Sequence, residues 1–561
     1  MPYDSVSSVW DDSDLMLKLK AELKSARETQ IRKHDDWNEN YELYRNKVKT
    51  NRLTQRQSVN IPLMKETIKT QLAHMDESPS IDWKELGGDE QKELIYQEVW
   101  NDTFKQDKHE LIDVLDKKNV LLYGIGTKML NIKKDGILIS SLDPYDIVFD
   151  PLMEVGNVET ARFIIRQNIF RSVREILADK RYTKKGKEEL KIWADSPPGI
   201  SQSGENLEKW EEKMKRLQSM GVDHGDFPLY AGGDRVVNLC EHYTTIWEGK
   251  EWVRRVIVYA DDQIEMANET LNDLIGVDFW PFTSWVEDPD GTDIYSDSIA
   301  DLIRVPNKIL NIWFSQLIEN RTLKNFQMSY INTETGQQPT TYVPGPGVQI
   351  PIKGNPRENV MPVEISGLDD TLAAINAITQ IAERASGATA IEKGEPEAGQ
   401  QTLGEIQILV GKAQERTVAM AKFYRIAWYE TAWKWDKLMH ANGPRFLKLY
   451  KASHTGKMYP KRVFLNDWKS DVGYEPTVSS TSEQEAESVK GIQKLTFIMQ
   501  QFPNNPALRK ISQKRMLEII DLTPEELKQV EEAEDQAQSM QQSTQPMQPK
   551  PMQMPQVAPV V

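Results

Sequence analysis

Apolar and polar positions recur with two different periods in the first half of the chain. Apolar residues spaced three or four apart predict helices over residues 13–48, 61–75 and 89–123. From residue 124 the spacing changes to the alternation of strands, and an Asp-Gly pair at 135–136 predicts a hairpin. A strand with a short helix is expected at 160–180, and strand patterns fill 236–286. This half is therefore predicted to be a mixed α+β region.

Long helical patterns dominate the second half. They cover residues 295–325, 366–386, 402–441, 481–501 and 523–539. Pro306 lies inside the first of these, where its missing backbone N–H predicts a kink or a new start of the helix. Strand and turn patterns fill 326–365 and 444–475, and residues 196–235 are expected to be a polar insertion. The fold class predicted for the whole chain is α+β, predominantly helical.

The helix predicted at 366–386 carries a narrow apolar stripe with alanines beside it. Ser366 and Asp369 have the spacing of a capping box, which predicts that the helix begins there. The stripe consists of Leu368, Leu372, Ile375 and Ile378. A narrow stripe with small neighbours favours close packing against another helix that runs alongside.

The segment ERASGATAIEKGEPEAGQQTLGEI, residues 383–406, separates two of the long helices. Its four glycines allow the backbone to turn, and Pro396 stops a helix from running through it. The first helix should end near residue 386 and the next should begin near residue 402. Between them we expect a flexible, acidic loop, whose tip is formed by Ile391, Glu392, Lys393, Gly394 and Glu395.

Charge and cysteine content narrow the class of protein. The 561 residues carry a net charge of −16, which argues against a general nucleic-acid coat because such a coat needs a basic surface. The single cysteine, Cys240, excludes a disulfide framework or a thiolate zinc site within one chain. We find no secretory leader and no apolar run of about 20 residues. We therefore expect a soluble intracellular protein with several domains.

Candidate catalytic and metal-binding motifs are weak. The histidines are scattered, and neither HExxH nor GxSxG occurs. GIGTK at 124–128 lacks the spacing of a phosphate-binding loop and precedes a strand instead of a helix. Asp143, Asp146 and Asp150 could gather around a hard cation, although the two Asp-Pro pairs at 142–151 favour turns. We expect no cofactor and no metal.

The helix predicted at 402–441 is rich in aromatic and basic residues. Its aromatic cluster comprises Trp428, Tyr429, Trp433 and Trp435. These rings could stack on nucleic-acid bases, but on a helix this dense they favour core or subunit packing. The basic residues are Lys412, Arg416, Lys422 and Arg425. Because glutamates are mixed among them, a solvated face is the preferred interpretation.

The order of the parts is more specific than any single motif. It is carried by WNENYELYRN (37–46), LDPYDIVFDP (142–151), YSDSIADLIRVPNKILNIWFSQLIENR (295–321) and the helix–loop–helix at 366–441. A mixed α+β region, a helix, a strand-rich insertion, a second helix, a loop and a long helix follow one another. This order resembles the portal proteins of tailed bacteriophages over roughly residues 30–535, with a first stem helix at about 297–322.

The resemblance implies named regions. They are an N-terminal α+β wing at 1–294, a first stem helix at 295–322, a strand-rich clip at 323–365, a second stem helix at 366–386, a tunnel loop at 387–402, a long kinked helix with wing return strands at 403–480, a helical crown at 481–539 and a disordered tail at 540–561. The insertion at 196–235 has no counterpart in this order.

The resemblance also implies roles for particular residues. The loop tip, Ile391 to Glu395, would face DNA in a channel. Lys324, Lys353 and Arg357 would contact the packaging motor or an adaptor at the clip. The stripe of Leu368, Leu372, Ile375 and Ile378 would pack stem helices of neighbouring subunits together.

The function implied is structural. A homo-oligomeric ring of about twelve subunits would occupy one capsid vertex of the virion and pass double-stranded DNA during packaging and ejection. Its partners would be the large terminase, the major capsid and scaffolding proteins and tail adaptor proteins, with no membrane involved. The ring would assemble in the cytoplasm of the host bacterium. Acidic walls agree with this role because they repel phosphate and let DNA slide.

Two other classes of protein are alternatives to a portal. The first is a metal-dependent hydrolase or nuclease that uses Asp143, Asp146 and Asp150. It requires converging polar groups, and the sequence shows no convincing set. The second is a helical scaffolding or adaptor protein without a channel. The strand patterns at 236–286 and 326–365 argue against it.

Overall fold

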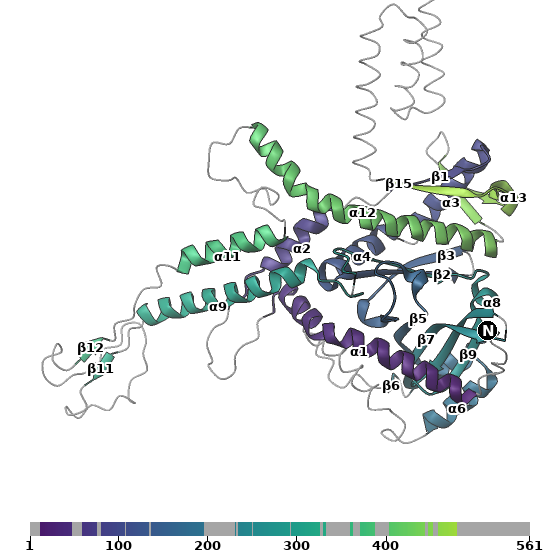
Figure 1. Cartoon of the computed structure of the whole chain (residues 1–561), viewed down its shortest axis with the longest axis horizontal. Helices are drawn as coiled ribbons and strands as arrows, with labels where there is room; N and C mark the ends of the chain where they lie inside the picture. The colour runs from purple at the N-terminus through teal and green to yellow at the C-terminus, as the bar shows by residue number, and fades with distance from the viewer. Residues whose placement is uncertain are drawn as a thin grey trace, which may run out of the picture. The chain divides into compact units, whose positions relative to one another are not determined.

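The computed structural model describes fifteen stretches of the chain (Figure 1). They are residues 12–47, 59–75, 80–106, 108–133, 136–195, 230–231, 234–249, 251–291, 293–325, 329–331, 360–362, 371–386, 403–443, 447–452 and 458–479. The chain divides into two compact units, Met1–Val478 and Ser479–Val561. Apart from Ser479, every described residue belongs to the first unit.

A three-stranded antiparallel sheet lies at the centre of this unit. Its strands are β2 (Ile125–Lys133), β3 (Gly136–Leu142) and β10 (Phe282–Val286), in the order β10-β2-β3. Because β2 is the middle strand, its first six residues are all buried. The hairpin between β2 and β3, whose last described pair is Lys133 with Gly136, confirms the one predicted from the Asp-Gly pair.

A second, six-stranded antiparallel sheet forms a layer of its own. Its order is β4-β5-β7-β8-β9, with β6 (Tyr230–Ala231) paired to β7. The other strands are β4 (Ile147–Phe149), β5 (Phe163–Ser172), β7 (Asp234–Glu248), β8 (Glu251–Ala260) and β9 (Ile264–Thr270). The 3-10 turns η1 (Pro144–Asp146) and η2 (Val158–Thr160) flank β4 and β5.

Helices cover both faces of the six-stranded sheet. Helix α1 (Asp12–Tyr44) places Leu15, Leu19 and Leu23, which are spaced four apart, on one face. The other face is covered by α5 (Val173–Ala178) and α6 (Lys184–Asp195), which bury Ile176 and Leu190 against β7 and β9. The short helix α8 (Leu271–Ile275) follows β9. Alternate residues of β7 therefore point into two different hydrophobic clusters.

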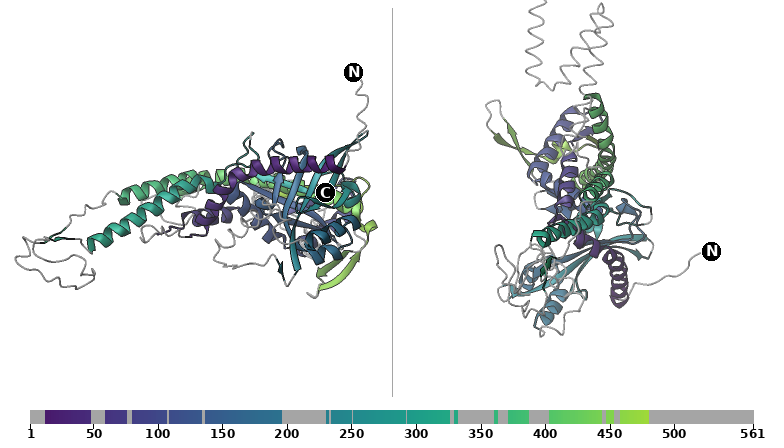
Figure 2. Two further views of the ribbon diagram at one scale, coloured as in Figure 1. Left: turned by 90° about the horizontal axis from the view of Figure 1, so that it is seen from below. Right: turned by 90° about the vertical axis from the view of Figure 1, so that its left-hand side faces the viewer.

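Long helices form the rest of the described structure. They are α2 (Leu63–His74), α3 (Glu90–Gln106), α4 (His109–Tyr123), α9 (Ile299–Asn325), α11 (Thr371–Ser386) and α12 (Leu403–Asn442). Figures 1 and 2 show α9 and α11 running side by side, and the two helices are in contact. Beyond α9, β11 (Ser329–Ile331) pairs with β12 (Val360–Pro362).

The last described elements pack around α3 and the end of α12. Strand β1 (Ser80–Glu85) pairs with β15 (Tyr474–Ser479), and β13 (Leu447–Ala452) pairs with β14 (Met458–Val463). The short helix α13 (Leu465–Trp468) lies between β14 and β15 in the chain. The Tyr96 ring of α3 stacks on Tyr474 with the ring centroids 4.0 Å apart, and this contact packs β15 against α3.

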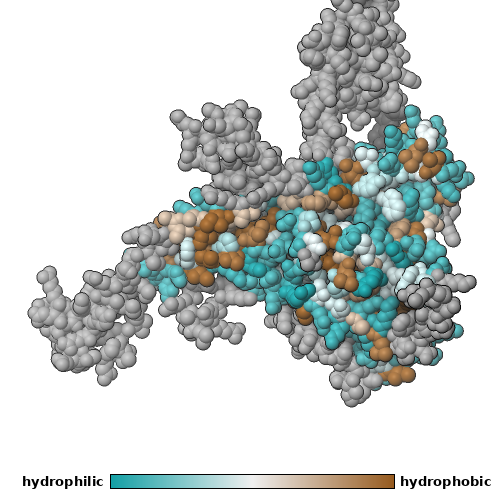
Figure 3. Space-filling view, viewed as in Figure 1, coloured by the Kyte–Doolittle hydropathy of each residue, from teal (hydrophilic) through white to brown (hydrophobic). Residues whose placement is uncertain are grey.

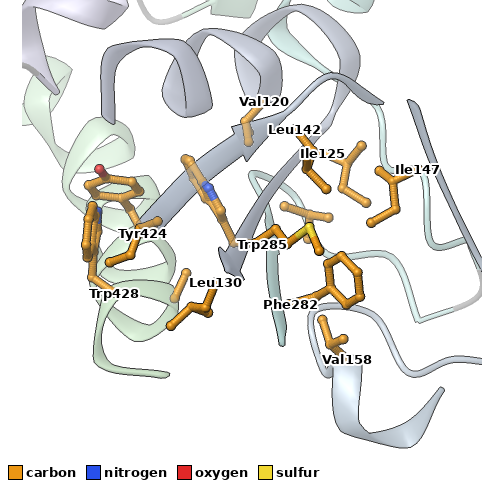
Figure 4. Close-up of a cluster of buried hydrophobic side chains, with 14 of the residues drawn as sticks. Val120, Ile125, Leu130, Leu142, Ile147, Val158, Phe282, Trp285, Tyr424 and Trp428 are labelled. Carbon is orange, nitrogen blue, oxygen red and sulfur yellow. The ribbon is translucent and has the colours of Figure 1, made fainter. Parts of the chain in front are cut away.

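The largest hydrophobic cluster joins these elements into one core. It draws on α2, α4, the three-stranded sheet, α9, α11 and α12. Figure 4 shows part of it: Trp285 from β10 lies near Tyr424 and Trp428 of α12, with Val120 of α4 above the strands. The rings of Trp285 and Tyr424 are 5.0 Å apart. Aromatic side chains therefore close the contact between α12 and the central sheet.

The predicted α+β class is confirmed, and three details differ from the prediction. The helix expected over 89–123 is two helices, because Lys108 adopts a left-handed conformation (φ 54°) that ends the helical path before α4. Pro306 neither breaks nor restarts α9, which runs through it. The predicted strand at 236–286 also contains α8.

Several expectations fall outside the described residues. They are the insertion at 196–229, most of the clip including Lys353 and Arg357, Leu368 and the capping box at 366–369, the loop tip Ile391 to Glu395, and the crown and tail from residue 480 onward.

Candidate functional site

Charged side chains hold the N-terminal turns of α9 against α1. Arg304 contacts Asp36 at 2.8 Å, and Lys308 pairs with Glu39. Arg304 also bonds Asp301 one turn earlier, at 3.0 Å. Asp301 in turn accepts a hydrogen bond from the α1 side chain Asn40 at 2.9 Å. The polar contacts to α1 thus lie within the first three turns of α9.

A second face of α9 binds the extended segment that leads into α2. Asn307, Asn311 and Ser315 are spaced four apart and therefore lie along one line on the helix. Their side-chain oxygens accept hydrogen bonds from the backbone N–H groups of Met64 (3.1 Å), Ile61 (2.8 Å) and Val59 (2.9 Å), respectively. Three side chains of α9 thus satisfy backbone donors of the extended residues before α2 and of its first turn.

Helix α11 covers a third face of α9. Ile375 and Ala382 are buried in the same cluster as Ile303 and Leu310 of α9. Ile375 is 5% exposed in the single chain. Ile378 is partly buried against this cluster. The apolar stripe predicted on α11 therefore packs, at Ile375 and Ile378, against α9 of the same subunit.

The remaining face of the α9–α11 pair is apolar and open. The fully exposed described positions of α11 are Leu372, Ala373, Asn376, Ala377, Gln380 and Ile381, none of which carries a charge. Leu372 is 59% exposed and Ile381 56%. Figure 3 shows hydrophobic side chains gathered over this pair of helices. Exposed apolar patches are typical of surfaces that bind a protein, a membrane or a ligand.

The open face continues along α9 with a regular spacing. Leu302, Val305, Ile312 and Gln316 are exposed and lie at the separations of a heptad repeat. Leu302 is 51% exposed. Charge appears among the exposed described positions only near the end of α9, at Arg321 and Lys324. Heptad spacing on an uncovered helix suits packing against another helix of nearly the same direction.

The two larger sheets and the helices other than α9 and α11 are called the body here. The body contains a buried cluster of charges. Lys117 bonds Asp113 at 2.7 Å within α4, and Lys128 of β2 bonds Asp116 at 2.5 Å. All four side chains are at most 1% exposed. Burial raises the pKa of Asp113, against the opposing pull of Lys117. The opposite charges lie in direct contact, as burial requires.

Aromatic residues of α12 and β10 complete this ionic cluster. Trp428 Nε1 donates to Asp113 at 3.2 Å, and Trp285 Nε1 donates to Asp116 at 2.7 Å. The ammonium of Lys117 lies 4.7 Å from the centre of the Tyr424 ring, and that of Lys128 lies 4.9 Å from both the Tyr424 and Trp428 rings. Of the aromatic cluster predicted on this helix, Trp428 and Trp435 are fully buried, whereas Tyr429 and Trp433 are partly exposed.

The three aspartates considered for a metal site are used by the fold. Asp143 accepts from the backbone N–H of Tyr145 (3.2 Å), and Asp146 accepts from Asn168 (3.1 Å). Asp150 forms a two-point ion pair with Arg162 at 2.6 and 2.8 Å. Burial opposes ionisation, but the hydrogen bonds of Arg162 and backbone N–H groups outweigh it and lower the pKa of Asp150. Within the described residues, no group of three or more His, Cys, Asp or Glu could hold a metal ion.

The two glycines of GIGTK have a packing role. Gly124 ends α4 in a left-handed conformation (φ 81°), and a Cβ there would lie 2.0 Å from the carbonyl oxygen of Ser296. A Cβ on Gly126 would lie 2.6 Å from the indole nitrogen of Trp285. Both glycines are therefore explained by close contacts within the fold. In the part of the chain that the structure covers, no helix is long and apolar enough to span a bilayer.

The other predicted site residues are only partly placed. Lys324 lies exposed at the end of α9. Lys353, Arg357, Leu368 and the five residues of the loop tip lie outside the described residues. The sequence reading did not single out Gln71, Lys117 or Lys128. Asp113 and Lys117 are four residues apart, but this spacing usually indicates an exposed pair on a helix and gives no sign of burial.

Together these features describe a closed, well-packed core and an uncharged apolar face that stays open on the helical pair. Residues 26–559, nearly the whole chain, match the family described as the phage SU10 portal protein. The chain belongs to this family of bacteriophage portal proteins, which are head-to-tail connectors. The family is structural and not enzymatic, and membership implies a ring oligomer at a capsid vertex that meets capsid and packaging components. No curated protein matches the chain.

Proposed function

We propose that this chain is one subunit of a homo-oligomeric ring of about twelve copies, through which double-stranded DNA enters and leaves the capsid. The observation that carries this proposal is the uncharged open face of α9 and α11. In a ring, each subunit presents one surface to the next, so a face left open in the single chain is covered by its neighbour. Leu372, Ile381 and Val305 are the most exposed large apolar side chains of the pair that such packing would bury.

The order of helices and strands, which resembles that of portal proteins, supports a proposed division of the ring into regions. Residues 1–294 would form the wing, with α9 as the stem helix of 295–322 and α11 as that of 366–386. The β11–β12 pair would belong to the clip at 323–365. Helix α12 would start the return through the wing at 403–480, and 481–539 would form the crown, followed by the tail at 540–561.

The loop at 387–402 would line the channel. Its tip, Ile391 to Glu395, brings two glutamates and one lysine to each subunit. Carboxylates repel phosphate and keep the duplex sliding, and Lys393 supplies one phosphate contact per subunit. The net charge of −16 on each chain acts in the same direction.

The clip would meet the packaging motor. Lys324, Lys353 and Arg357 are the proposed contacts, first with the large terminase and later with tail adaptor proteins. The wing would contact the major capsid and scaffolding proteins during assembly in the host cytoplasm. The support for Lys324 is its exposed position at the end of α9, next to β11 in the chain.

Electron microscopy of the purified, negatively stained protein tests the ring directly. We expect annular particles with a central hole, and sedimentation at the mass of about twelve subunits. Incubation with duplex DNA and magnesium should leave the DNA intact. Small particles without a hole would contradict the ring, and cleavage lost in Asp146→Asn would favour the hydrolase instead.

The role of the loop needs a separate test. Replacing residues 391–398 by a short Gly-Ser linker should leave ring assembly intact, because the helices on either side are unchanged. Genome packaging or retention in assembled particles should fall. If particles with the shortened loop hold full-length genomes at wild-type yield, the loop is only a connector.

A further inference from the structure

Helix α2 lies at the junction of the helical pair and the body. It contacts α9, α4 and α12. It also reaches α11, because the side-chain amide of Gln71 donates a hydrogen bond to the carbonyl of Ser386 at 2.9 Å. Gln71 is 1% exposed and Ser386 5%. Ser386 is the last residue of α11, so Gln71 supplies a partner to one of the carbonyls that a helix end leaves unpaired.

The end of α2 is held in the same manner. The ammonium of Lys117 in α4 donates to the carbonyl of Met75, the residue that follows α2. Lys117 also bonds Asp113, and Asp113 accepts from the indole of Trp428 in α12. A side chain again satisfies a carbonyl at a helix end, and this side chain belongs to the buried ionic cluster.

These contacts form a continuous path. It begins at Ser386, passes through Gln71 and one turn of α2 to Met75, and continues through Lys117 and Asp113 to Trp428. Every side chain that donates or accepts along it is at most 1% exposed. The path therefore joins the end of α11 to α12, the two helices that bracket residues 387–402.

Apolar packing alone would hold these helices together with less geometric constraint. A buried polar group that loses its partner is strongly destabilising, so a polar path of this kind excludes placements that break any of its bonds. Buried ion pairs often add little net stability compared with apolar side chains of the same volume. The main effect of such ion pairs is then to select which arrangement of the helices the chain populates.

We propose that Gln71 and Lys117 are positioning residues that set where α12 lies relative to the end of α11. Gln71 holds the last carbonyl of α11, and Lys117 connects α2 to the part of α12 that carries Tyr424 and Trp428. The proposal concerns distances within one chain. It stands whether or not residues 387–402 line a channel, and whether or not the chain forms a ring.

Pulsed electron paramagnetic resonance on the full-length protein tests it. Nitroxide labels are placed at Gln380→Cys on α11 and Lys422→Cys on α12, both exposed positions. Cys240 is fully buried and is left in place. Labelled subunits are diluted with an excess of unlabelled protein, so that the measured distance is within one chain. A single narrow distance is expected for the wild-type sequence.

Gln71→Met on this labelled background removes the donor and keeps a side chain of similar length. We expect the distance to broaden or to shift by about 1–2 Å or more, the size of typical helix displacements. Lys69→Met, an exposed change on the same helix, is the matched control and should leave the distance unchanged. Because all variants carry the same labels, any effect of the labels on assembly is common to them.

A second variant separates positioning from stability. Asp113→Leu combined with Lys117→Met replaces the ion pair by apolar side chains, so the protein should stay folded while the distance broadens. The proposal is wrong if Gln71→Met keeps the narrow wild-type distance. It is also wrong if the distance in the folded double variant is unchanged. Sedimentation of the same samples reports ring formation independently.

Discussion

The body and the α9–α11 pair differ in how much of their apolar surface they bury within one chain. The body closes its core within one chain and can even bury four charges, because Lys117, Lys128, Asp113 and Asp116 find partners there. The helical pair buries only the contact between its two helices. Its outward face, which includes Leu302 and Leu372, is left open by the part of the chain that the structure describes. The body thus buries its own apolar surface, whereas the pair leaves one apolar face exposed.

This difference has an energetic consequence. Burying a large aliphatic side chain completely contributes roughly 1.5–3 kcal/mol, so covering one that is half exposed contributes about 1 kcal/mol. Four such residues on each subunit, Leu302, Val305, Leu372 and Ile381, would together make assembly favourable. A mutation in the body should therefore change the stability of the chain, and a mutation on the open face should change only assembly.

The largest expected effect is in the body. Lys128→Met should lower the free energy of unfolding by roughly 3–5 kcal/mol, because it leaves Asp116 charged, buried and without its ammonium partner. Chemical denaturation followed by tryptophan fluorescence measures the change. Lys133→Met, at the exposed end of the same strand, is the control and should cost less than about 0.5 kcal/mol. Equal effects of the two variants would show that the buried cluster is not what holds the body together.

The second test compares two residues of α11 three positions apart. Ile375→Asp should destabilise the single chain by roughly 3 kcal/mol or more, because the charge would be buried against α9. Leu372→Asp should leave chain stability nearly unchanged and reduce ring assembly, because the charge then falls in the contact between subunits. Thermal unfolding and sedimentation measure the two properties separately.

The opposite outcomes for these two variants would contradict the proposed difference between the two regions. Intact rings of Leu372→Asp at wild-type concentration would show that the open face of α11 meets solvent, not a neighbour. Normal chain stability of Ile375→Asp would show that the α9–α11 contact is dispensable for folding. Asn376→Asp serves as a milder variant on the same open face, where a charge replaces an already polar side chain.

The order of helices and strands could be predicted from the sequence because it rests on local patterns. The apolar period of three to four residues placed α12 within one residue of its observed ends, and the Asp-Gly pair identified the β2–β3 hairpin. The break between α3 and α4 could not be predicted, because neither glycine nor proline marks Lys108, which takes a left-handed conformation without them.

Tertiary contacts decided the remaining differences. Pro306 was expected to interrupt α9, but the ion pairs of Arg304 and Lys308 with α1 hold the helix on both sides of it. The stripe on α11 could be predicted, but not which helix covers each residue: Ile375 faces α9 of the same chain, and Leu372 faces outward. The buried ionic cluster was missed because Asp113 and Lys117 have the spacing of an exposed ion pair on a helix.

The third test uses pH to separate the regions. Burial of the His440 imidazole opposes protonation, but the hydrogen bond and charge of Asp436, 3.0 Å away, outweigh it and raise the pKa of His440. A raised pKa in the folded state stabilises the body at pH values below about 6.5, the unfolded value, and this contribution is lost as pH rises through the folded pKa.

His440→Gln should remove that dependence. The wild-type protein should exceed the variant by roughly 1.5 kcal/mol in unfolding free energy near pH 6, the scale of a hydrogen bond to a charged group, and the difference should shrink at higher pH. Ring assembly should show little change over this interval, because the exposed positions described on α11 are uncharged. A difference that stays constant with pH would mean that His440 contributes only by packing.

The smallest expected effect lies on the surface of the body. Hydrogen bonds from Arg181 are the main reason that the pKa of Asp179 is lowered to about 2, and the side chains meet at 2.6 Å. A lowered pKa means that the contribution is present above the unfolded value near 3.9 and is lost as pH falls through the folded value. Because Arg181 is exposed to solvent, water and salt screen the pair, and Asp179→Asn should cost only about 0.5 kcal/mol at pH 7.

Denaturation at pH 7 and at pH 3, each with and without added salt, measures this loss of stability. The loss should decrease at pH 3 and in high salt, and ring assembly should be unaffected, since Asp179 follows α5 on the side of the sheet that the body covers by itself. A larger loss that is independent of salt would show that the hydrogen bond from the Arg181 guanidinium, which the Nδ2 of an asparagine cannot accept, matters more than the charge of Asp179.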